Sequence, residues 1–243
     1  MASSLRIEAL SAGYGSVSVL HDVTLSVAER ETVALLGTNG NGKSTLIKAI
    51  MGIVRPSAGR IVATIDGQEH DLCALPTEAI VDLGIALVPE GRRLFPRLSV
   101  EENLLLGAYR KAARERLKDN LAHCYDAFPR LAERKRQLVG TMSGGEQQMV
   151  ALGRAIMSAP TLLIVDEPSV GLAPALVSRT IQKIAELKER YSLTVLMAEQ
   201  NFTQAIKIAD KGYVIVHGEI AFKGESPEEM NQSDLIRQYY LGT

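Results

Sequence analysis

The chain has 243 residues, of which 46% are hydrophobic and 23% charged, and this is long enough to bury the core of one large α/β domain. Its 27 Lys and Arg nearly balance its 28 Asp and Glu, so the formal net charge of −1 gives no reason to expect a nucleic-acid partner. The first residues lack the apolar segment of a signal peptide, and no run approaches the ~20 apolar residues that span a bilayer, so any membrane role is expected to depend on a partner. Cys73 and Cys124 are far apart in the sequence and are expected to be reduced thiols of a cytosolic protein.

The first ninety residues carry both strand and helix patterns. Apolar and polar residues alternate within residues 5–37 around a turn at Gly13-Tyr14-Gly15, which predicts strands. The Asp66-Gly67 pair that follows residues 60–65 is typical of a two-residue hairpin turn. The other elements expected here are a helix over residues 43–52, a helix over residues 76–83, and a buried strand over residues 84–89 that Pro89 ends.

The middle of the chain has a different pattern of apolar and charged residues. Residues 90–158 place apolar positions among many charges and have few strand signals, which predicts a helical subdomain. Residues 161–166 then form a short apolar run, typical of a strand in the middle of a parallel sheet. After it we expect a helix over residues 175–190, a strand over 193–198, a helix over 202–209, a hairpin around His217-Gly218, and a helix over 226–240.

A phosphate-binding motif lies near the start of the chain. Gly37 through Ser44 match the pattern G-x-x-x-x-G-K-[ST], between an apolar strand-like run and a helical pattern. The glycines let backbone N–H groups approach phosphate oxygens, and the helix N-terminus points its unpaired N–H groups at the same place. Lys43 can reach the outer phosphates, and the Ser44 hydroxyl is placed to ligate magnesium. The residues expected to hold the nucleotide phosphates are Gly37, Thr38, Asn39, Gly40, Asn41, Gly42, Lys43, Ser44 and Thr45.

Two adjacent acids, Asp166 and Glu167, follow the apolar strand over residues 162–165. In a parallel sheet this strand end lies beside the phosphate loop, so Asp166 is expected to hold Mg²⁺ directly or through water. Glu167 projects in a different direction and can orient or deprotonate an attacking water. The alternative is a pair of solvated acids at a strand end, which on its own would be equally acceptable but leaves the phosphate loop without a carboxylate.

A second glycine-rich stretch, Ser143-Gly144-Gly145-Glu146-Gln147, opens a helical run that continues through Ile156. It predicts another helix N-terminus that is rich in donors and attracts anions. One phosphate loop does not need a second phosphate binder in the same chain, so this stretch is expected to face a nucleotide held by a different subunit. The alternative is a plain helix cap, although a capping Ser143 would need no pair of glycines.

The order of these three motifs resembles that of ABC-type ATPases, because Ser143 to Gln147 are similar to the ABC signature and lie between the phosphate loop and the acid-ended strand. The resemblance covers essentially the whole chain. It implies an α/β fold with a P-loop NTPase core (residues 1–89 and 159–243), an N-terminal antiparallel β subdomain, and an inserted α-helical subdomain with the signature (residues 90–158). It further implies that two such domains sandwich two ATP molecules head to tail with Mg²⁺, each signature completing the partner's site.

The resemblance also implies roles for single residues. Tyr14 matches the aromatic residue that stacks on adenine, and Glu90 lies where most members have a Gln that touches magnesium. Two positions depart from the family pattern: Ala173 replaces an Asp, and Gln200 replaces a His that contacts the γ-phosphate. Glutamine can bond a phosphate oxygen but carries no positive charge, so the site is expected to hydrolyse ATP slowly or to rely mainly on Glu167. The catalytic residues implied are Glu167, Lys43 and Gln200, and the Mg²⁺ ligands implied are Ser44, Glu90 and Asp166.

Further stretches are similar to one branch of the family, the LivF-type ATP-binding subunits of branched-chain amino-acid importers. They are residues 88–96, 101–104, 128–131, 171–174 and 199–201. The resemblance implies a second, LivG-type ATPase or a second copy as dimer partner, two transmembrane permease subunits, and indirectly an extracytoplasmic solute-binding protein. It implies a peripheral position on the cytoplasmic face of the inner membrane. Residues 92–98 would then line a groove for a permease helix; the alternative is an ordinary basic surface loop.

Two functional classes stay open on the sequence. One is a transport ATPase that energises uptake of leucine, isoleucine and valine, or of related small amides or urea. The other is a non-transport ABC ATPase that acts as a nucleotide-driven switch. Switch members usually have two cassettes in one chain or a long coiled-coil insertion, so one phosphate loop, one signature and a short helical insert favour transport. A nucleotide-binding module without hydrolysis is a third class, which Glu167 disfavours.

Overall fold

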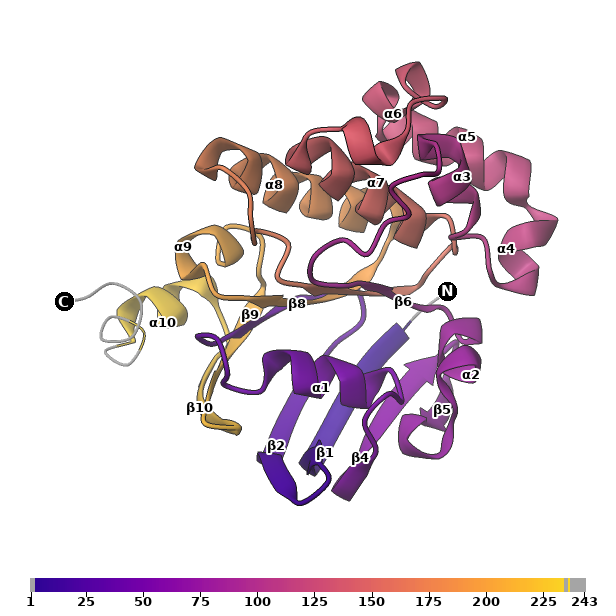
Figure 1. Cartoon of the computed structure of the whole chain (residues 1–243). Coiled ribbons are helices and arrows are strands. Elements are labelled where there is room, and N and C mark those ends of the chain that lie inside the picture. The colour runs from indigo at the N-terminus through magenta and orange to yellow at the C-terminus, as the bar shows by residue number, and fades with distance from the viewer. Residues whose placement is uncertain (1–2, 234–235, 237–243) are drawn as a thin grey trace.

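A six-stranded sheet in the order β10-β9-β3-β8-β7-β6 forms the centre of the computed structural model, which describes residues 3–233 and 236 (Figure 1). Five of its strands are parallel, and β10 pairs with β9 in the antiparallel direction. The apolar run after Thr161 forms the buried strand β7, as predicted. The strands are β3 (Thr32–Leu36), β6 (Ile85–Val88), β7 (Leu162–Asp166), β8 (Thr194–Glu199), β9 (Lys211–Val216) and β10 (Glu219–Gly224).

A second, antiparallel sheet in the order β2-β1-β4-β5 is built from the N-terminal part of the chain. Its strands are β1 (Ser3–Tyr14), β2 (Val17–Val27), β4 (Pro56–Ile65) and β5 (Gln68–Asp71). The predicted hairpin turn is present, because Ile65 pairs with Gln68 and both residues between them have positive φ, 50° at Asp66 and 80° at Gly67. The expected antiparallel β subdomain is confirmed.

The central sheet separates two hydrophobic cores, because alternate side chains of its strands point to opposite faces. Ala34 and Leu36 pack with the helices α7 (Gly144–Ile156) and α8 (Pro174–Tyr191), whereas Val33 and Leu35 pack with α1 (Lys43–Ile50) and the antiparallel sheet. In Figure 1, α7 and α8 lie above the central sheet, and α1 lies below it. The phosphate loop, which joins β3 to α1, therefore starts from the middle strand of the fold.

Residues 90–158 are mainly helical and lie toward the top right of Figure 1. The α-helices of this stretch are α7, already described, and before it α3 (Val100–Leu105), α4 (Lys111–Glu115), α5 (Leu117–Ala127) and α6 (Pro129–Glu133). The remaining α-helices of the described residues are α2 (Thr77–Asp82), α9 (Phe202–Ala205) and α10 (Pro227–Gln232). The fold class expected from the sequence is thus confirmed.

The helices α1 and α2 differ from their predicted ranges by one or two residues at an end, whereas α9 and α10 end several residues early. The helix expected over residues 202–209 ends at Ala205, because the backbone then tightens into bonds such as Lys207 N to Gln204 O. Within the helix expected over residues 226–240, α10 ends at Gln232, since Ser233 has an extended backbone with ψ 122°, and Ile236 is again helical. Residues 234–235 and 237–240 of that prediction lie outside the described residues.

Both cysteines are free thiols, as expected. Cys124 is fully buried between α5 and α7, and burial raises the pKa of its thiol to about 12. Within residues 3–233 and 236, no helix combines the length and the apolar character that a bilayer crossing requires.

Candidate nucleotide-binding site

The phosphate loop leaves the carboxyl end of β3 and enters α1 through two glycines with left-handed backbones, Gly40 with φ 83° and Gly42 with φ 103°. Gly42 occupies the N-cap position of α1, where no side chain accepts a hydrogen bond from the first turn, and the first turn holds no acid. A Cβ at Gly42 would lie 2.8 Å from Leu20 Cδ2. The sequence thus leaves the first-turn N–H groups of α1 available to an anion.

The turn between β9 and β10 holds the phosphate loop in its conformation through hydrogen bonds to Asn41. Asn41 Oδ1 accepts a 3.0 Å hydrogen bond from His217 N, and Asn41 O accepts a 3.2 Å bond from Gly218 N. The Asn41 amide also donates to Thr38 Oγ1 at 2.8 Å. The sequence predicts a hairpin at His217-Gly218 but does not predict its contact with Asn41, because the two segments are 176 residues apart.

Lys43 points back into the loop. Its ammonium donates to Gly37 O at 2.7 Å and to Thr38 O at 3.1 Å. It also lies 2.9 Å from Glu167 Oε1 in an ion pair whose side chains are only 3% and 6% exposed. Two residues predicted to act in catalysis are therefore in direct contact.

Asp166 ends β7 beside the start of α1, where Ser44 Oγ donates to its Oδ1 at 3.3 Å. Burial raises the pKa of the Asp166 carboxyl to about 6; the Ser44 hydroxyl opposes this shift. The negative charges of Glu167 and Glu90 raise it further, so Glu90 lies close enough to act on the same group.

The side chains of Ser44 and Asp166, with Glu90 nearby, fit the predicted Mg²⁺ ion. The described residues hold no group of three or more His, Cys, Asp or Glu that could enclose a metal on its own. Magnesium at phosphate sites, however, takes one or two protein oxygens and completes its shell with phosphate oxygens and water. A hydroxyl beside a buried carboxylate with two more acids nearby is such a donor set, and a divalent cation would neutralise their repulsion.

Glu167 has a strained backbone, with φ 47° in the left-handed region that non-glycine residues seldom occupy. Its N–H donates to Ala198 O at 2.9 Å, which ties the residue to the neighbouring strand β8. This conformation turns the carboxylate toward Lys43 and away from the direction of the adjacent Asp166 side chain, whose partner is Ser44.

Glu199, at the end of β8, is a residue that sequence reasoning missed. It is fully buried, and its carboxylate accepts hydrogen bonds from Ser169 N and Oγ (both 2.9 Å), Gln200 N (2.9 Å) and Asn201 N (3.0 Å). The available signal was an acid directly after the apolar residues 195–198, a pattern similar to that of Asp166.

The two departures from the family pattern lie in loops at this edge of the sheet. Gln200 follows β8, is exposed, and lines a shallow hollow with Ser169 and Val170. Ala173 occupies the N-cap position of α8 without a side-chain hydrogen bond to that helix. Pro174 follows at the first helical position, where its missing N–H costs nothing.

Tyr14 lies at the end of β1, with 46% of its surface exposed. Its hydroxyl lies 3.5 Å from Thr45 Oγ1 and accepts from Lys48 Nζ at 3.4 Å, and that ammonium is 5.6 Å from the ring centroid. The ring borders an open hollow of about 630 Å³ that Arg55 also lines. An exposed ring tied to the first turns of α1 is available for stacking.

Ser143 is the N-cap of α7 and forms a capping box with Glu146. Ser143 Oγ donates to Glu146 Oε2 at 2.8 Å, Glu146 N donates back to Ser143 Oγ at 3.4 Å, and Arg134 pairs with the Glu146 carboxylate at 2.9 Å. Among the described residues, no hydrogen bond or ion pair joins residues 143–147 to the phosphate loop. The predicted signature thus begins a capped helix separate from this chain's own phosphate loop.

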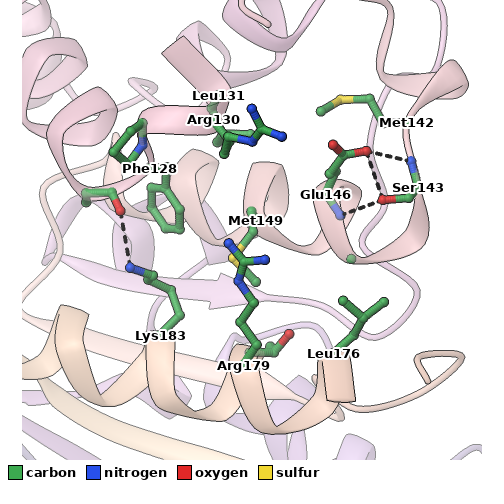
Figure 2. A pocket seen from close by; sticks show the side chains of 14 residues that line it. Phe128, Arg130, Leu131, Met142, Ser143, Glu146, Met149, Leu176, Arg179 and Lys183 are labelled. Atoms are coloured by element: carbon green, nitrogen blue, oxygen red, sulfur yellow. Dashed lines mark hydrogen bonds between the residues drawn. The ribbon is translucent and has the colours of Figure 1, made fainter. Parts of the chain in front are cut away.

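A pocket of about 260 Å³ lies between α6, α7 and α8, and Figure 2 shows Ser143 and Glu146 at one side of it. Apolar side chains line it together with the cations Arg130, Arg179 and Lys183. Lys183 is bound in place, since it donates to Ala127 O at 3.3 Å and its ammonium is 5.7 Å from the Phe128 ring centroid.

Arg92 connects the segment after Glu90 to the signature helix. Its guanidinium donates to Gln148 Oε1 on α7 at 3.2 Å and to Val170 O at 3.4 Å. Arg154 of α7 donates in turn to Arg92 O and Arg93 O, at 3.0 and 2.8 Å. The structure therefore brings Lys43, Ser44, Asp166 and Glu167 together in one cluster, with Glu90 near it and Arg92 as the link to α7.

A comparison with protein families matches residues 20–170 to the ABC transporter family. The high-affinity branched-chain amino acid transport ATP-binding protein BraG of Pseudomonas aeruginosa is 42% identical over 98% of this chain and 99% of its own length. The lipopolysaccharide export system ATP-binding protein LptB of Haemophilus influenzae is 32% identical over 99% of this chain and 98% of its own length.

A solved structure supports the same relationship. An ATP-binding cassette of an ABC transporter, crystallised in its ADP conformation, superposes with a TM-score of 0.83 at 25% identity and covers 99% of both chains. The family expected from the three motifs is confirmed.

Proposed function

The chain belongs to the ABC transporter family as an ATP-hydrolysing, ATP-binding subunit, and from this we propose that it energises uptake of branched-chain amino acids, or of related small amides or urea, through separate permease subunits. The observation that carries the proposal is the 42% identity to BraG over nearly the full length of both chains. Lipopolysaccharide export is the second candidate, supported by the lower identity of 32% to LptB. The non-transport switch remains the alternative outside transport.

In the proposed reaction the nucleotide phosphates bind the N–H groups of the phosphate loop and the first turn of α1. Tyr14 stacks on the adenine, and Lys43 contacts the outer phosphates. Glu167 orients a water for in-line attack on the γ-phosphate and accepts its proton, with Gln200 as a further hydrogen-bonding group. Mg²⁺, held by Ser44, Asp166 and Glu90, would neutralise charge on the phosphate oxygens when bound.

The site is proposed to be completed by a second subunit, either a LivG-like ATPase or a second copy of this chain. The N-terminus of α7, residues 143–147, would supply N–H groups and the Ser143 hydroxyl to the partner's γ-phosphate. Within the described part of the chain, these residues have no hydrogen bond to the chain's own phosphate loop, which supports a role toward another molecule. ATP would then close two subunits, and hydrolysis would let them open.

The permease contact is proposed for residues 92–98 and the helices after them. Phe95 is 53% exposed, and exposed apolar side chains also lie at the end of α3 and just after it, at Leu105, Leu106 and Tyr109. Exposed apolar side chains of this kind mark interaction surfaces. Asn103, which is fully buried, donates to Phe95 O and Ser99 O at 3.0 Å and so fixes the loop on α3. The chain would sit peripherally on the cytoplasmic face of the inner membrane.

The proposal is tested by purifying tagged Glu167→Gln protein with ATP from detergent-solubilised native membranes and identifying the chains that accompany it. A second ATPase and two hydrophobic permeases are expected, with a solute-binding protein encoded beside them. The matched control is Glu167→Gln without nucleotide, which should retain less of the second ATPase. Recovery of lipopolysaccharide-export components would favour the second candidate, and recovery of soluble factors alone would refute the transport proposal.

A further inference from the structure

Glu199 is a fully buried acid that the proposed reaction does not use. Its carboxylate accepts four hydrogen bonds, and no cation lies within ion-pair distance of it among the described residues. Burying a charged carboxylate is costly unless hydrogen bonds compensate it, so here the four donors must do so alone. A gain in stability therefore does not explain why Glu199 is buried. The geometry that its hydrogen bonds impose on the neighbouring residues explains it better.

The four donors come from two different loops. Ser169 belongs to the loop after β7, two residues beyond Glu167, while Gln200 and Asn201 begin the loop after β8. The backbone of Glu199 touches a third loop, because Gly37 N donates to Glu199 O at 3.4 Å. One residue thus joins the loops at the carboxyl ends of the neighbouring strands β3, β8 and β7.

We propose that Glu199 is a positioning residue for ATP hydrolysis, which acts through Gln200 by tying the backbone of Gln200 to Ser169. These hydrogen bonds fix the distance between the loop that starts with Gln200 and the loop that follows Glu167. Gln200 and Glu167 are therefore presented to the γ-phosphate and its attacking water as one unit. This inference rests on the proposed roles of Glu167 and Gln200, but not on which solute the complex transports.

The test measures kcat and KM for ATP in the purified complex of the full-length chain, with variants at Glu199. In Glu199→Gln the amide keeps one acceptor oxygen and places an NH₂ group against N–H donors, and in Glu199→Ala all four donors lose their acceptor. Misplacement of a reacting group by a fraction of an ångström is costly, so we expect kcat to fall about tenfold to a hundredfold, with KM within about threefold of wild type. Asp210→Asn is the matched control, since Asp210 accepts a 2.7 Å bond from Thr32 N at the opposite end of β3.

A double-mutant cycle separates positioning from general support of the fold. If Glu199 acts through Gln200, Glu199→Ala lowers kcat strongly in the wild type and by no more than about twofold in a Gln200→Ala background. Three outcomes would each overturn the proposal. The kcat losses of the two single variants could multiply in the double variant, Gln200→Ala could leave kcat unchanged, or Glu199→Ala could have the wild-type kcat. If the Glu199 variants do not fold, Ser169→Ala carries the test: removing one donor should lower kcat about threefold, and an unchanged kcat would refute the role.

Discussion

The Lys43 ammonium is 2.9 Å from the Glu167 carboxylate, in an ion pair that is almost completely buried. Its other two bonds go to Gly37 O and Thr38 O, and an ammonium has three donors, so all of them are in use. Lys43 must therefore give up at least one of these bonds to contact a phosphate. If the bond that it gives up is the one to Glu167, the carboxylate would become free to bind the attacking water of the proposed reaction.

Glu167→Gln is expected to lower the ATP turnover number by about a hundredfold or more, because an amide cannot accept the proton of the attacking water. ATP should remain bound, so the variant is expected to form a dimer with ATP that size-exclusion chromatography detects. Glu189→Gln on the exposed side of α8 is the matched control and should behave as wild type. Full turnover in Glu167→Gln would assign the general base elsewhere.

Gln200→His is expected to raise turnover of the assembled complex about fivefold, the difference between a neutral and a charge-assisted hydrogen bond to the phosphate. The gain should be larger at about pH 6 than at about pH 8, because the imidazole is protonated mainly below its ordinary pKa. Steady-state hydrolysis at both pH values checks this. Equal turnover of variant and wild type would contradict the idea that Gln200 makes this site slow.

Tyr14→Ala is expected to raise the Kd for ATP by about fivefold to a hundredfold, because stacking of a base on an aromatic ring contributes about 1–3 kcal/mol. Tyr14→Phe keeps the ring and loses only the contacts with Thr45 and Lys48, so its Kd should stay close to that of wild type. Titration with a fluorescent ATP analogue measures both. An equal loss in the two variants would show that the hydroxyl, and not the ring, binds the nucleotide.

Asp166→Asn is expected to stabilise the protein in the absence of Mg²⁺ and nucleotide. Burial raises the pKa of Asp166 to about 6, above its value in the unfolded chain, so the folded state binds this proton more tightly. The penalty for ionised Asp166 is therefore present above about pH 6 and fades as the pH falls toward about 4. Urea unfolding should show the variant more stable at about pH 7.5, with a smaller difference at about pH 5. A difference that grows on acidification would contradict this sign.

The local elements of the site were predictable from the sequence because each has a short-range cause. The apolar run before Asp166 forms a buried strand, and the Asp66-Gly67 turn forms the expected hairpin. The pattern Ser143-x-x-Glu146 is a recognised capping box, and the structure contains that cap. Ser143 is thus a helix cap as well as a candidate phosphate ligand, and the cap does not exclude the second role.

Contacts between distant segments were not predictable, because one sequence does not reveal which polar side chains meet. The bonds of Glu199 to Ser169 and the pair of Lys43 with Glu167 both depend on the order of strands in the sheet. The ends of α9 and α10 were also missed, since propensity patterns continue beyond the residues at which tighter turns or an extended backbone end the helix.

The strand order has a consequence for how the protein is made. The strand β3, which precedes the phosphate loop, pairs only with β8 and β9 in the described sheet, and Asn41 is held by His217 and Gly218. A ribosome has therefore released the whole phosphate loop long before it synthesises the strands on either side of it. Until residues 194–218 emerge, the nascent chain carries the nucleotide motif without the scaffold that shapes it. A chain truncated before β8 would contain every residue of that motif and still lack a formed nucleotide site.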